Sequence, residues 1–254
     1  MKIVVLAKLV PDLVEELEIN DEGTALDLTW LRLKLNEFDD HAIEQAVLLK
    51  ERSGAHITLI VPDMEGADDV LFTAAAKGFD RLVKLSGDFE ADLNNHALAR
   101  AFASILKGEL PDLVLTGVQA HNDLDGSLGA LLAGYLDLPY VGYISGVNAN
   151  GGSALVRKEY PGGLIAEMEV TLPAVLGIQA AESPPSYVAF SKIRQAMKTA
   201  VIDDKQTPLL DSHGGAVVKR MFVPESGERA SMLEGSLEEI AGKLTGIFQN
   251  LGLL

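Results

Sequence analysis

The sequence contains no cysteine, and this absence excludes several kinds of chemistry. Disulfide bonds, thiolate nucleophiles and cysteine-ligated metal or iron–sulfur sites are all ruled out. A chain that needs no disulfide is compatible with a reducing compartment.

Long apolar runs and a surplus of basic residues are also lacking. The apolar run from Ile3 to Ala7 is far too short to span a bilayer, so we expect neither a secretory nor a membrane segment. The expected location is the cytoplasm of a bacterium or archaeon.

There are 37 acidic and 21 basic residues, which give a formal charge of −16. The electric field of this negative charge repels the phosphate backbone of nucleic acids, so nucleic-acid binding is not expected. The simplest role of the charge is to keep the protein soluble.

Familiar catalytic and phosphate-binding patterns are missing as well. The sequence has neither a Gly-x-Gly-x-x-Gly fingerprint nor a Gly-x-x-x-x-Gly-Lys-Ser/Thr loop. None of its five histidines has a histidine three or four residues away, so no helical metal pair is predicted. The lack of a catalytic set favours binding or electron carriage over covalent catalysis.

What the first half does contain is a regular alternation of strands and helices. Buried apolar runs predict strands at 3–7, 57–61, 81–85 and 113–115. Helical spacing predicts four helices. Asp39 or Asp40 would cap the first, the second begins at Asp68–Asp69, the third begins at Asp92 or Asn94, and the fourth follows Gly126-Ser127 with Leu128 on its apolar face. This alternation favours a doubly wound, mainly parallel α/β sheet. Residues 8–12 are expected to form a loop, and residues 26–30 a short strand.

The pattern changes from Tyr140 onward. Strands are predicted at 143–147, 154–160, 164–170 and 172–178, with a hairpin turn at Pro161-Gly162-Gly163. We therefore expect an α/β domain over residues 1–181. Residues 182–254 are predicted to be a C-terminal arm with a linker at 203–215. The arm would end in a helix over 236–251, which Ser236 and Glu239 would start as a capping box. Such an arm suggests a partner chain, although it could also wrap its own domain.

Residues 111–136 are the best candidate for a ligand site. The run Leu113-Val114-Leu115 predicts a strand, a polar loop follows, and an amphipathic helix comes next. In a doubly wound sheet, ligands lie beyond the carboxyl ends of the strands, and a helix start suits an anion such as phosphate. An ordinary strand-to-helix connection would give the same pattern.

Several segments, taken in order, resemble the beta subunit of electron transfer flavoprotein. They are 4–12 (the family's V-K-x-V-P-D), 36–46 (N-P-F-D-x-x-A-x-E-x-A, with Glu37 for proline), 112–120 (D-L-V-L-x-G-x-Q-A), 158–163 with 169–175, and 185–190. The resemblance covers nearly the whole chain. It implies an adenine-nucleotide-binding, Rossmann-like fold with a β-hairpin.

The resemblance also implies cofactors, partners and site residues. Members pair with an alpha subunit that holds most of a redox-active FAD, and the beta chain usually binds AMP, or a second FAD in bifurcating relatives. The implied nucleotide-binding residues are Leu6, Asn36, Phe38, Asp39, Val61, Gly117, Gln119, Ala120, Asp123, Gly126, Ser127, Leu128 and Gly129. The implied dehydrogenase-docking residues are Tyr187, Phe190 and Ile193. Leu128 stands where the family has threonine, and Leu13 where it often has an aromatic residue near the flavin.

The expected function is therefore that of an electron-carrier subunit rather than an enzyme in its own right. It would accept electrons from a flavin dehydrogenase and pass them to a quinone-reducing or other acceptor. One alternative is a free-standing adenine-nucleotide-binding protein, hydrolytic or regulatory. Another is a relative that kept the alpha-subunit interface and lost the nucleotide.

Overall fold

The computed structural model describes residues 1–87, 89, 93–124, 126, 128–207, 213–225, 227 and 230–254. The chain divides into two compact units, Met1–Met221 and Phe222–Leu254. Among the helices in these described ranges, none has the length and apolarity needed to cross a membrane.

The first unit is built on a parallel sheet, as the sequence predicted. Within the described residues this sheet has seven strands in the order β12-β5-β4-β1-β6-β11-β7, and all neighbouring strands run parallel. The strands are β1 (Lys2–Leu6), β4 (His56–Pro62), β5 (Arg81–Ser86), β6 (Leu113–Gly117), β7 (Tyr140–Ile144), β11 (Ala174–Ile178) and β12 (Ile202–Gln206).

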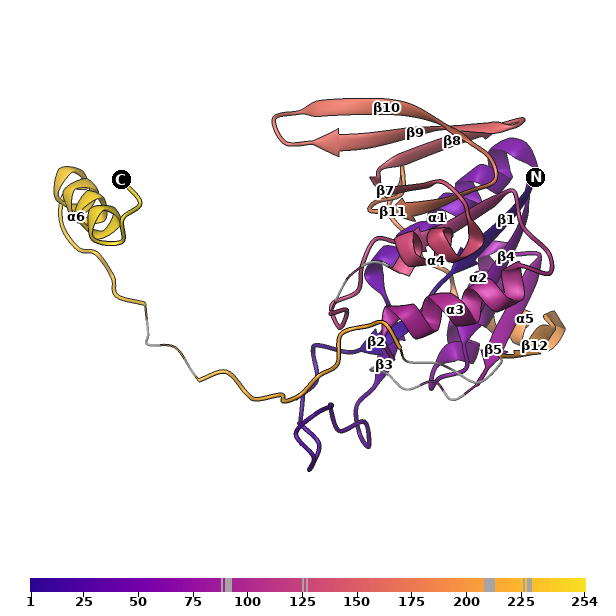
Figure 1. Ribbon diagram of the computed structural model, residues 1–254, viewed down its shortest axis with the longest axis horizontal. Coiled ribbons are helices and arrows are strands. Elements are labelled where there is room, and N and C mark those ends of the chain that lie inside the picture. Colours follow the sequence, from indigo (N-terminus) through magenta and orange to yellow (C-terminus); the bar gives the residue numbers. More distant parts are fainter. Residues whose placement is uncertain are drawn as a thin grey trace. The chain divides into compact units, whose positions relative to one another are not determined.

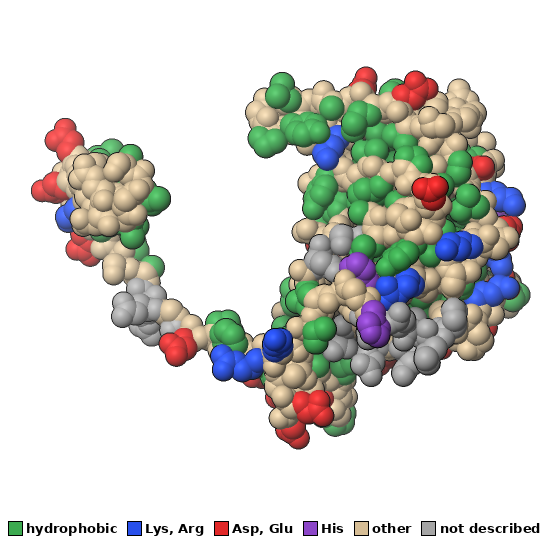
Figure 2. All heavy atoms as spheres, in the orientation of Figure 1, with side chains coloured by type: hydrophobic (Ala, Val, Ile, Leu, Met, Phe, Trp, Pro, Cys, Tyr) green, Lys and Arg blue, Asp and Glu red, His purple; other side chains and the backbone are tan. Residues whose placement is uncertain are grey.

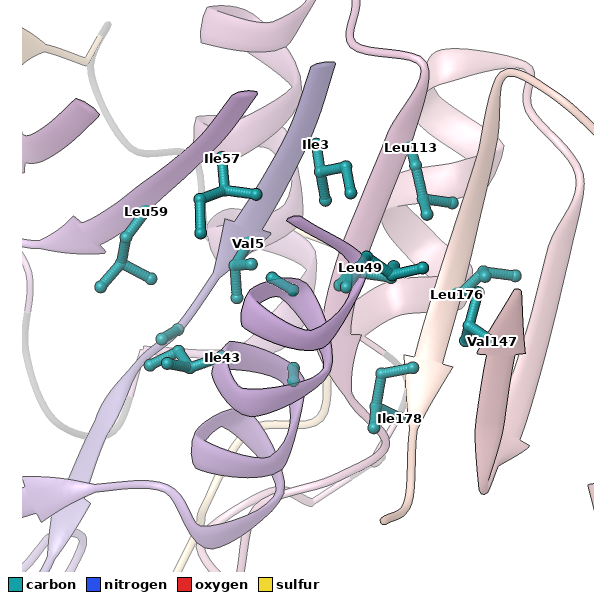
Figure 3. Close-up of a cluster of buried hydrophobic side chains, with 14 of the residues drawn as sticks. Ile3, Val5, Ile43, Leu49, Ile57, Leu59, Leu113, Val147, Leu176 and Ile178 are labelled. Atoms are coloured by element: carbon teal, nitrogen blue, oxygen red, sulfur yellow. The ribbon is translucent and has the colours of Figure 1, made fainter. Parts of the chain in front are cut away.

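Helices cover both faces of this sheet (Figure 1). On one face lie α1 (Glu37–Ser53) and α2 (Ala67–Lys77), and α5 (Phe190–Thr199) packs against α2. On the other lie α3 (Asn95–Leu106) and α4 (Leu128–Leu136). Side chains of β1 alternate between the two layers, and Figure 3 shows Ile3 and Val5 with the α1 residues Ile43 and Leu49. Burial on both faces explains the unbroken apolar run of this strand.

The strand order reverses beside β1. From β1 the chain moves outward through β4 and β5, and then crosses to β6 on the other side of β1. Loops leaving β1 and β6 therefore diverge at their carboxyl ends, which is the place where doubly wound sheets bind ligands.

A separate antiparallel sheet is inserted in the sequence between β7 and β11 of the parallel sheet. Its described strands are β8 (Gly146–Asn150), β9 (Ser153–Tyr160) and β10 (Leu164–Thr171), in the order β10-β9-β8. The predicted turn joins β9 to β10, with φ of 82° at Gly162 and 75° at Gly163. The single strand predicted over 143–147 is wrong. Because β7 belongs to the parallel sheet and β8 to the antiparallel one, the chain changes sheet at Ser145.

Three further expectations about strands were wrong. The expected loop at 8–12 contains β2 (Leu9–Pro11), which pairs with β3 (Leu33–Leu35). The expected strand at 26–30 makes only an isolated bridge from Leu26 to Ile19. The start of the expected linker at 203–215 belongs to β12, which lies at the edge of the sheet. Its residues are polar and largely exposed, so they lack the alternation of apolar and polar residues that would predict a strand.

Helix ends follow the sequence more closely than these strands do. Asn94 caps α3 by accepting from the Ala97 amide at 2.9 Å, as one of the two predicted starts of this helix, and α3 ends at Leu106. Gly78 follows α2 in the left-handed conformation, which commonly ends a helix. The residue at the N-cap of α1 is Asn36, so the capping role predicted for Asp39 or Asp40 was wrong.

The second unit contains α6 (Leu237–Asn250). The predicted capping box is present, with Ser236 and Glu239 each bonding the other's main-chain amide. None of the residues of this helix, all of which are described, is buried. Its apolar side chains are exposed on the surface of the helix, as Figure 2 shows. Leu237 is 89% exposed and Phe248 is 42% exposed.

Candidate functional site at the carboxyl edge of the sheet

One buried carboxylate joins the two diverging strands. Asp39 lies in the first turn of α1 and is 3% exposed. Its Oδ2 accepts a hydrogen bond from the Lys8 amide just after β1 at 3.0 Å, and its Oδ1 accepts one from the Gly117 amide at the end of β6 at 2.8 Å. Asp39 therefore bridges the point where the strand order reverses, and it lies inside the first turn of α1, after the N-cap residue Asn36.

Burial has a strong effect on this carboxyl group. Loss of water raises the pKa of Asp39 from 3.8 to about 6, although the hydrogen bonds from the Lys8 and Gly117 amides and the Lys8 charge act in the opposite direction. Desolvation favours the neutral form, whereas amide donors favour the ionised form. The group thus changes charge close to neutral pH, in direct contact with both strands.

The residue at 117 must be small for this bridge to form. A Cβ on Gly117 would lie 2.5 Å from Asp39 Oδ1 and 2.8 Å from the Phe38 Cβ. Glycine lets the first turn of α1 approach the end of β6 closely.

The loop after β6 is fastened to the same place. Asn36 donates from Nδ2 to the Gln119 carbonyl at 3.0 Å, and Asp123 Oδ2 accepts from the Ala120 amide at 2.8 Å. The other oxygen of Asp123 pairs with the Lys8 ammonium. Both side chains are almost buried: that of Asp123 is 5% exposed and that of Lys8 is 10% exposed. Sequence reasoning missed Lys8 as a site residue; the available signal was a lysine directly after a buried strand.

The start of α4 meets the end of β6. A Cβ on Gly129 would lie 2.7 Å from the hydroxyl oxygen of Thr116, so the two segments touch. The Thr116 hydroxyl is fully buried and has no hydrogen-bond partner among the described residues. Leu128 is buried beside Gly129, Gly126 adopts a left-handed φ of 59°, and Ser127 lies outside the described residues. The N–H groups in the first turn of α4, which have no carbonyl partner within the helix, therefore lie next to the Thr116 hydroxyl.

The other predicted nucleotide-binding residues are placed differently. Leu6 and Val61 are buried, but in the two core layers on opposite faces of the sheet. Phe38 is partly buried, and the Gln119 side chain is exposed. The structure thus brings together Asn36, Asp39, Gly117, Ala120, Asp123 and Gly129, whereas the side chains of Leu6 and Val61 do not share one cavity.

The donors at this edge suit an anionic group. They are the Lys8 ammonium, the Thr116 hydroxyl and the start of α4, and a phosphate is the kind of ligand that such donors bind. A cavity lined by Lys8, Phe89, Leu93 and Asn122, among others, has a volume of about 20 Å³. That volume suits one water molecule. A nucleotide would require the Phe89 and Leu93 side chains to move.

The predicted docking residues lie on another surface of the first unit. Tyr187 is 90% exposed and Phe190, the first residue of α5, is 63% exposed. Ile193 instead lines a groove of about 580 Å³ between α1, α2, β3 and residues 185–193. Two of the three side chains are thus available for contact with another protein.

Comparison with known proteins identifies the family. Residues 30–208 match the family model described as the electron transfer flavoprotein domain. The chain belongs to the electron transfer flavoprotein family. It is 32% identical to the electron transfer flavoprotein subunit beta of Methylophilus methylotrophus over 97% of both chains. It is 34% identical to that of Syntrophomonas wolfei over 79% of this chain and 78% of the relative.

A relative from a plant matches over a similar length. The mitochondrial subunit beta of Oryza sativa subsp. japonica is 31% identical over 96% of this chain and 97% of the relative. These full-length matches confirm the resemblance that the sequence segments indicated, and they support the role of an electron transfer flavoprotein beta subunit.

Proposed function

We propose that the chain is the beta subunit of a heterodimeric electron transfer flavoprotein in the cytoplasm of a bacterium or archaeon. It pairs with an alpha subunit that holds most of the FAD. The pair carries electrons from flavin dehydrogenases to a quinone-reducing or other acceptor protein. The observation that carries the proposal is the 32% identity to a beta subunit over 97% of both chains.

The second unit supports the proposal that the chain needs a partner subunit. Its helix α6 has a complete capping box, yet it buries no residue. A 14-residue helix is marginal in water on its own, and most helices are stabilised by covering an apolar face. An alpha subunit that packs on Leu244, Ile247 and Phe248 would supply that cover. FAD held largely by the partner supplies the redox chemistry, while this chain positions and shields it.

The carboxyl edge of β1 and β6 is the place for AMP, or for a second FAD. Lys8 would neutralise a phosphate, the start of α4 would donate main-chain N–H groups, and Thr116 would gain a partner for its buried hydroxyl. Asn36 and Asp39 would hold the neighbouring loops in position. The chemistry of the site fits a nucleotide, and opening it requires the Lys8–Asp123 ion pair and the Phe89 side chain to rearrange.

The test is to purify the chain with and without its candidate alpha subunit, denature each sample, and identify the released nucleotides by absorbance and mass. A one-to-one heterodimer that releases one FAD and one AMP supports the proposal, and two FAD indicate a bifurcating relative. FAD alone would mean that the beta-chain nucleotide has been lost. A colourless chain that stays alone and carries only ATP or AMP would contradict electron carriage.

A pair of variants tests the position of the nucleotide. Lys8→Gln should lose AMP from the heterodimer but keep FAD, because only the beta-chain phosphate loses its cation. Lys107→Gln is the matched control, because Lys107 is exposed at the far end of α3. Equal AMP content in the two variants would place the nucleotide elsewhere.

A further inference from the structure

A buried carboxylate on α1 holds the segment that precedes the docking residues. Glu44 is 5% exposed and lies in the middle of α1. Its Oε2 accepts hydrogen bonds from the Ser186 amide and from the Ser186 hydroxyl, each at 3.0 Å. The Lys77 ammonium of α2 donates to the same oxygen at 3.0 Å. One carboxylate thus joins two helices and the segment before α5.

The surroundings of Glu44 keep it ionised. Burial raises the pKa of its carboxyl group, but the donors from Ser186 and Lys77 outweigh burial and leave the pKa below its ordinary value. The side chains of Lys77 and Glu44 are only 5% and 6% exposed, so water screens their attraction little. Removing one partner of a buried ion pair of this kind strongly destabilises the fold, because the other charge is left buried and uncompensated.

Among the described residues, Glu44 makes the side-chain hydrogen bonds that hold this stretch of chain. Upstream, Glu182 is fixed to α1 by Gln45 and by both guanidinium nitrogens of Arg52. Downstream, α5 packs against α2. Between them, within the part of the chain that the structure describes, the hydrogen bonds from residues 183–189 to the rest of the first unit all end on Glu44.

The exposed docking residues follow directly. Tyr187 is next to Ser186, and Phe190 comes four residues after it, with the Arg194 guanidinium 5.0 Å from the centre of its ring. Neither aromatic side chain is buried, so neither can fix its own main chain by packing. The position of Tyr187 therefore depends on what holds the main chain at Ser186, and that of Phe190 depends both on this contact and on the packing of α5 against α2.

We propose that Glu44 is a positioning residue for partner docking, which holds residues 185–190 in the conformation that a flavin dehydrogenase recognises. This inference rests on the proposed docking role of Tyr187 and Phe190. Glu44 itself faces the interior and does not touch the partner. Its contribution is to remove the ordering cost that a loose segment would otherwise incur when the complex forms.

The test uses Glu44→Gln in the assembled heterodimer, with Glu51→Gln as the matched control. Glu51 makes the same carboxylate-to-amide change on the same helix, but it is exposed. In Glu44→Gln, an amide donor would face the Lys77 ammonium or the Ser186 donors. We expect the Ser186 amide to exchange its hydrogen at least about tenfold faster than in the control, because its local protection is lost.

The functional readout is steady-state electron transfer from the flavin dehydrogenase that reduces the wild-type heterodimer. We expect Glu44→Gln to raise the KM for the heterodimer by about tenfold while kcat stays within about twofold, because ordering cost enters on association. Ser186→Ala, which keeps the amide and loses only the hydroxyl, should give an intermediate rise. A general loss of structure would instead lower kcat and the FAD content together.

Two results would overturn the inference and one would overturn its premise. If Ser186 exchange in Glu44→Gln equals that in Glu51→Gln, Glu44 does not hold the segment. If exchange accelerates but KM is unchanged while Phe190→Ala raises KM, the segment docks without needing Glu44. If Phe190→Ala itself leaves KM unchanged, the docking role of the segment is wrong, and the positioning role fails with it.

Discussion

Helix α3 of the first unit and helix α6 of the second begin in the same way and differ in how far their own unit buries them. Asn94 accepts from the Ala97 amide at the start of α3, and Ser236 accepts from the Glu239 amide at the start of α6. Both helices carry an apolar face. Helix α3 buries Phe102 completely beneath the sheet, whereas Phe248 of α6 stays 42% exposed. The periodic pattern thus predicts an apolar face, but it does not say which surface covers it.

The largest expected difference comes from truncating one phenylalanine in each helix. Phe102→Ala should lower the unfolding free energy of the isolated chain by about 3–5 kcal/mol, because it leaves a cavity in the core. Phe248→Ala should change it by less than about 0.5 kcal/mol and instead weaken the heterodimer. Urea unfolding of the isolated chain and dissociation of the heterodimer measure the two effects. An equal loss in the isolated chain would mean that α6 is already packed there.

The buried unit should also show a pH dependence that Asp39 causes. Its pKa is raised from 3.8 in the unfolded chain to about 6 in the fold, so the folded state holds the proton more tightly. The associated stability is fully present below about pH 4 and is lost as pH rises through 6, a loss of about 3 kcal/mol.

The variant Asp39→Asn isolates this contribution. It removes the titrating group, and it also gives the Lys8 and Gly117 amides a poorer acceptor, so it should be less stable overall. The informative quantity is the difference between wild type and variant in urea unfolding from pH 4 to pH 8. That difference should shrink as pH rises; if it grows, Asp39 is stabilised in its ionised form.

Close packing in the first unit should make Gly117 intolerant of a methyl group. Gly117→Ala should cost about 1–3 kcal/mol, because Asp39 and Phe38 would have to shift. Gly134→Ala is the control within α4, where a Cβ would meet nothing within 4 Å. It should stabilise the chain by about 0.5–1 kcal/mol through helix propensity. Thermal unfolding of both variants compares them, and similar losses would argue against a specific contact at Gly117.

The smallest expected effect is the loss of stability when either helix cap is removed. Asn94→Ala should lower the unfolding free energy of the isolated chain by about 1 kcal/mol. Ser236→Ala removes a comparable cap, yet its cost of about 1 kcal/mol should be measurable only in the heterodimer, where α6 is covered. A matching loss in the isolated chain would show that α6 contributes to stability without a partner.

Sequence reasoning succeeded where each residue carries its own signal. The two-sided burial of β1 is visible in its apolar run, and the capping box of α6 depends on two residues close together in sequence, Ser236 and Glu239. It failed where the signal comes from distant chain. Asp39 looked like a helix cap because the Lys8 and Gly117 amides that occupy its oxygens are far away in sequence. Strand β12 looked like a linker because an exposed edge strand needs no apolar period.

The same limit applies to the candidate site. The resemblance indicated Asn36, Asp39 and the loop after β6, and the structure brings these residues together. Lys8 was missed as a site residue because its ion pair with Asp123 spans more than a hundred residues. In the sequence Glu44 is only one matching position of the family pattern at 36–46, and its contact with Ser186 required the fold to be known.

The apolar face that the second unit does not bury by itself has a consequence for the chain in a cell. A newly made copy would display an apolar helix on a short, separate unit, which is the kind of segment that proteases cut and that aggregates most readily. Its half-life would depend on how quickly a partner covers that face. Synthesis in step with the covering chain would keep the free form scarce, and excess copies would be removed by degradation.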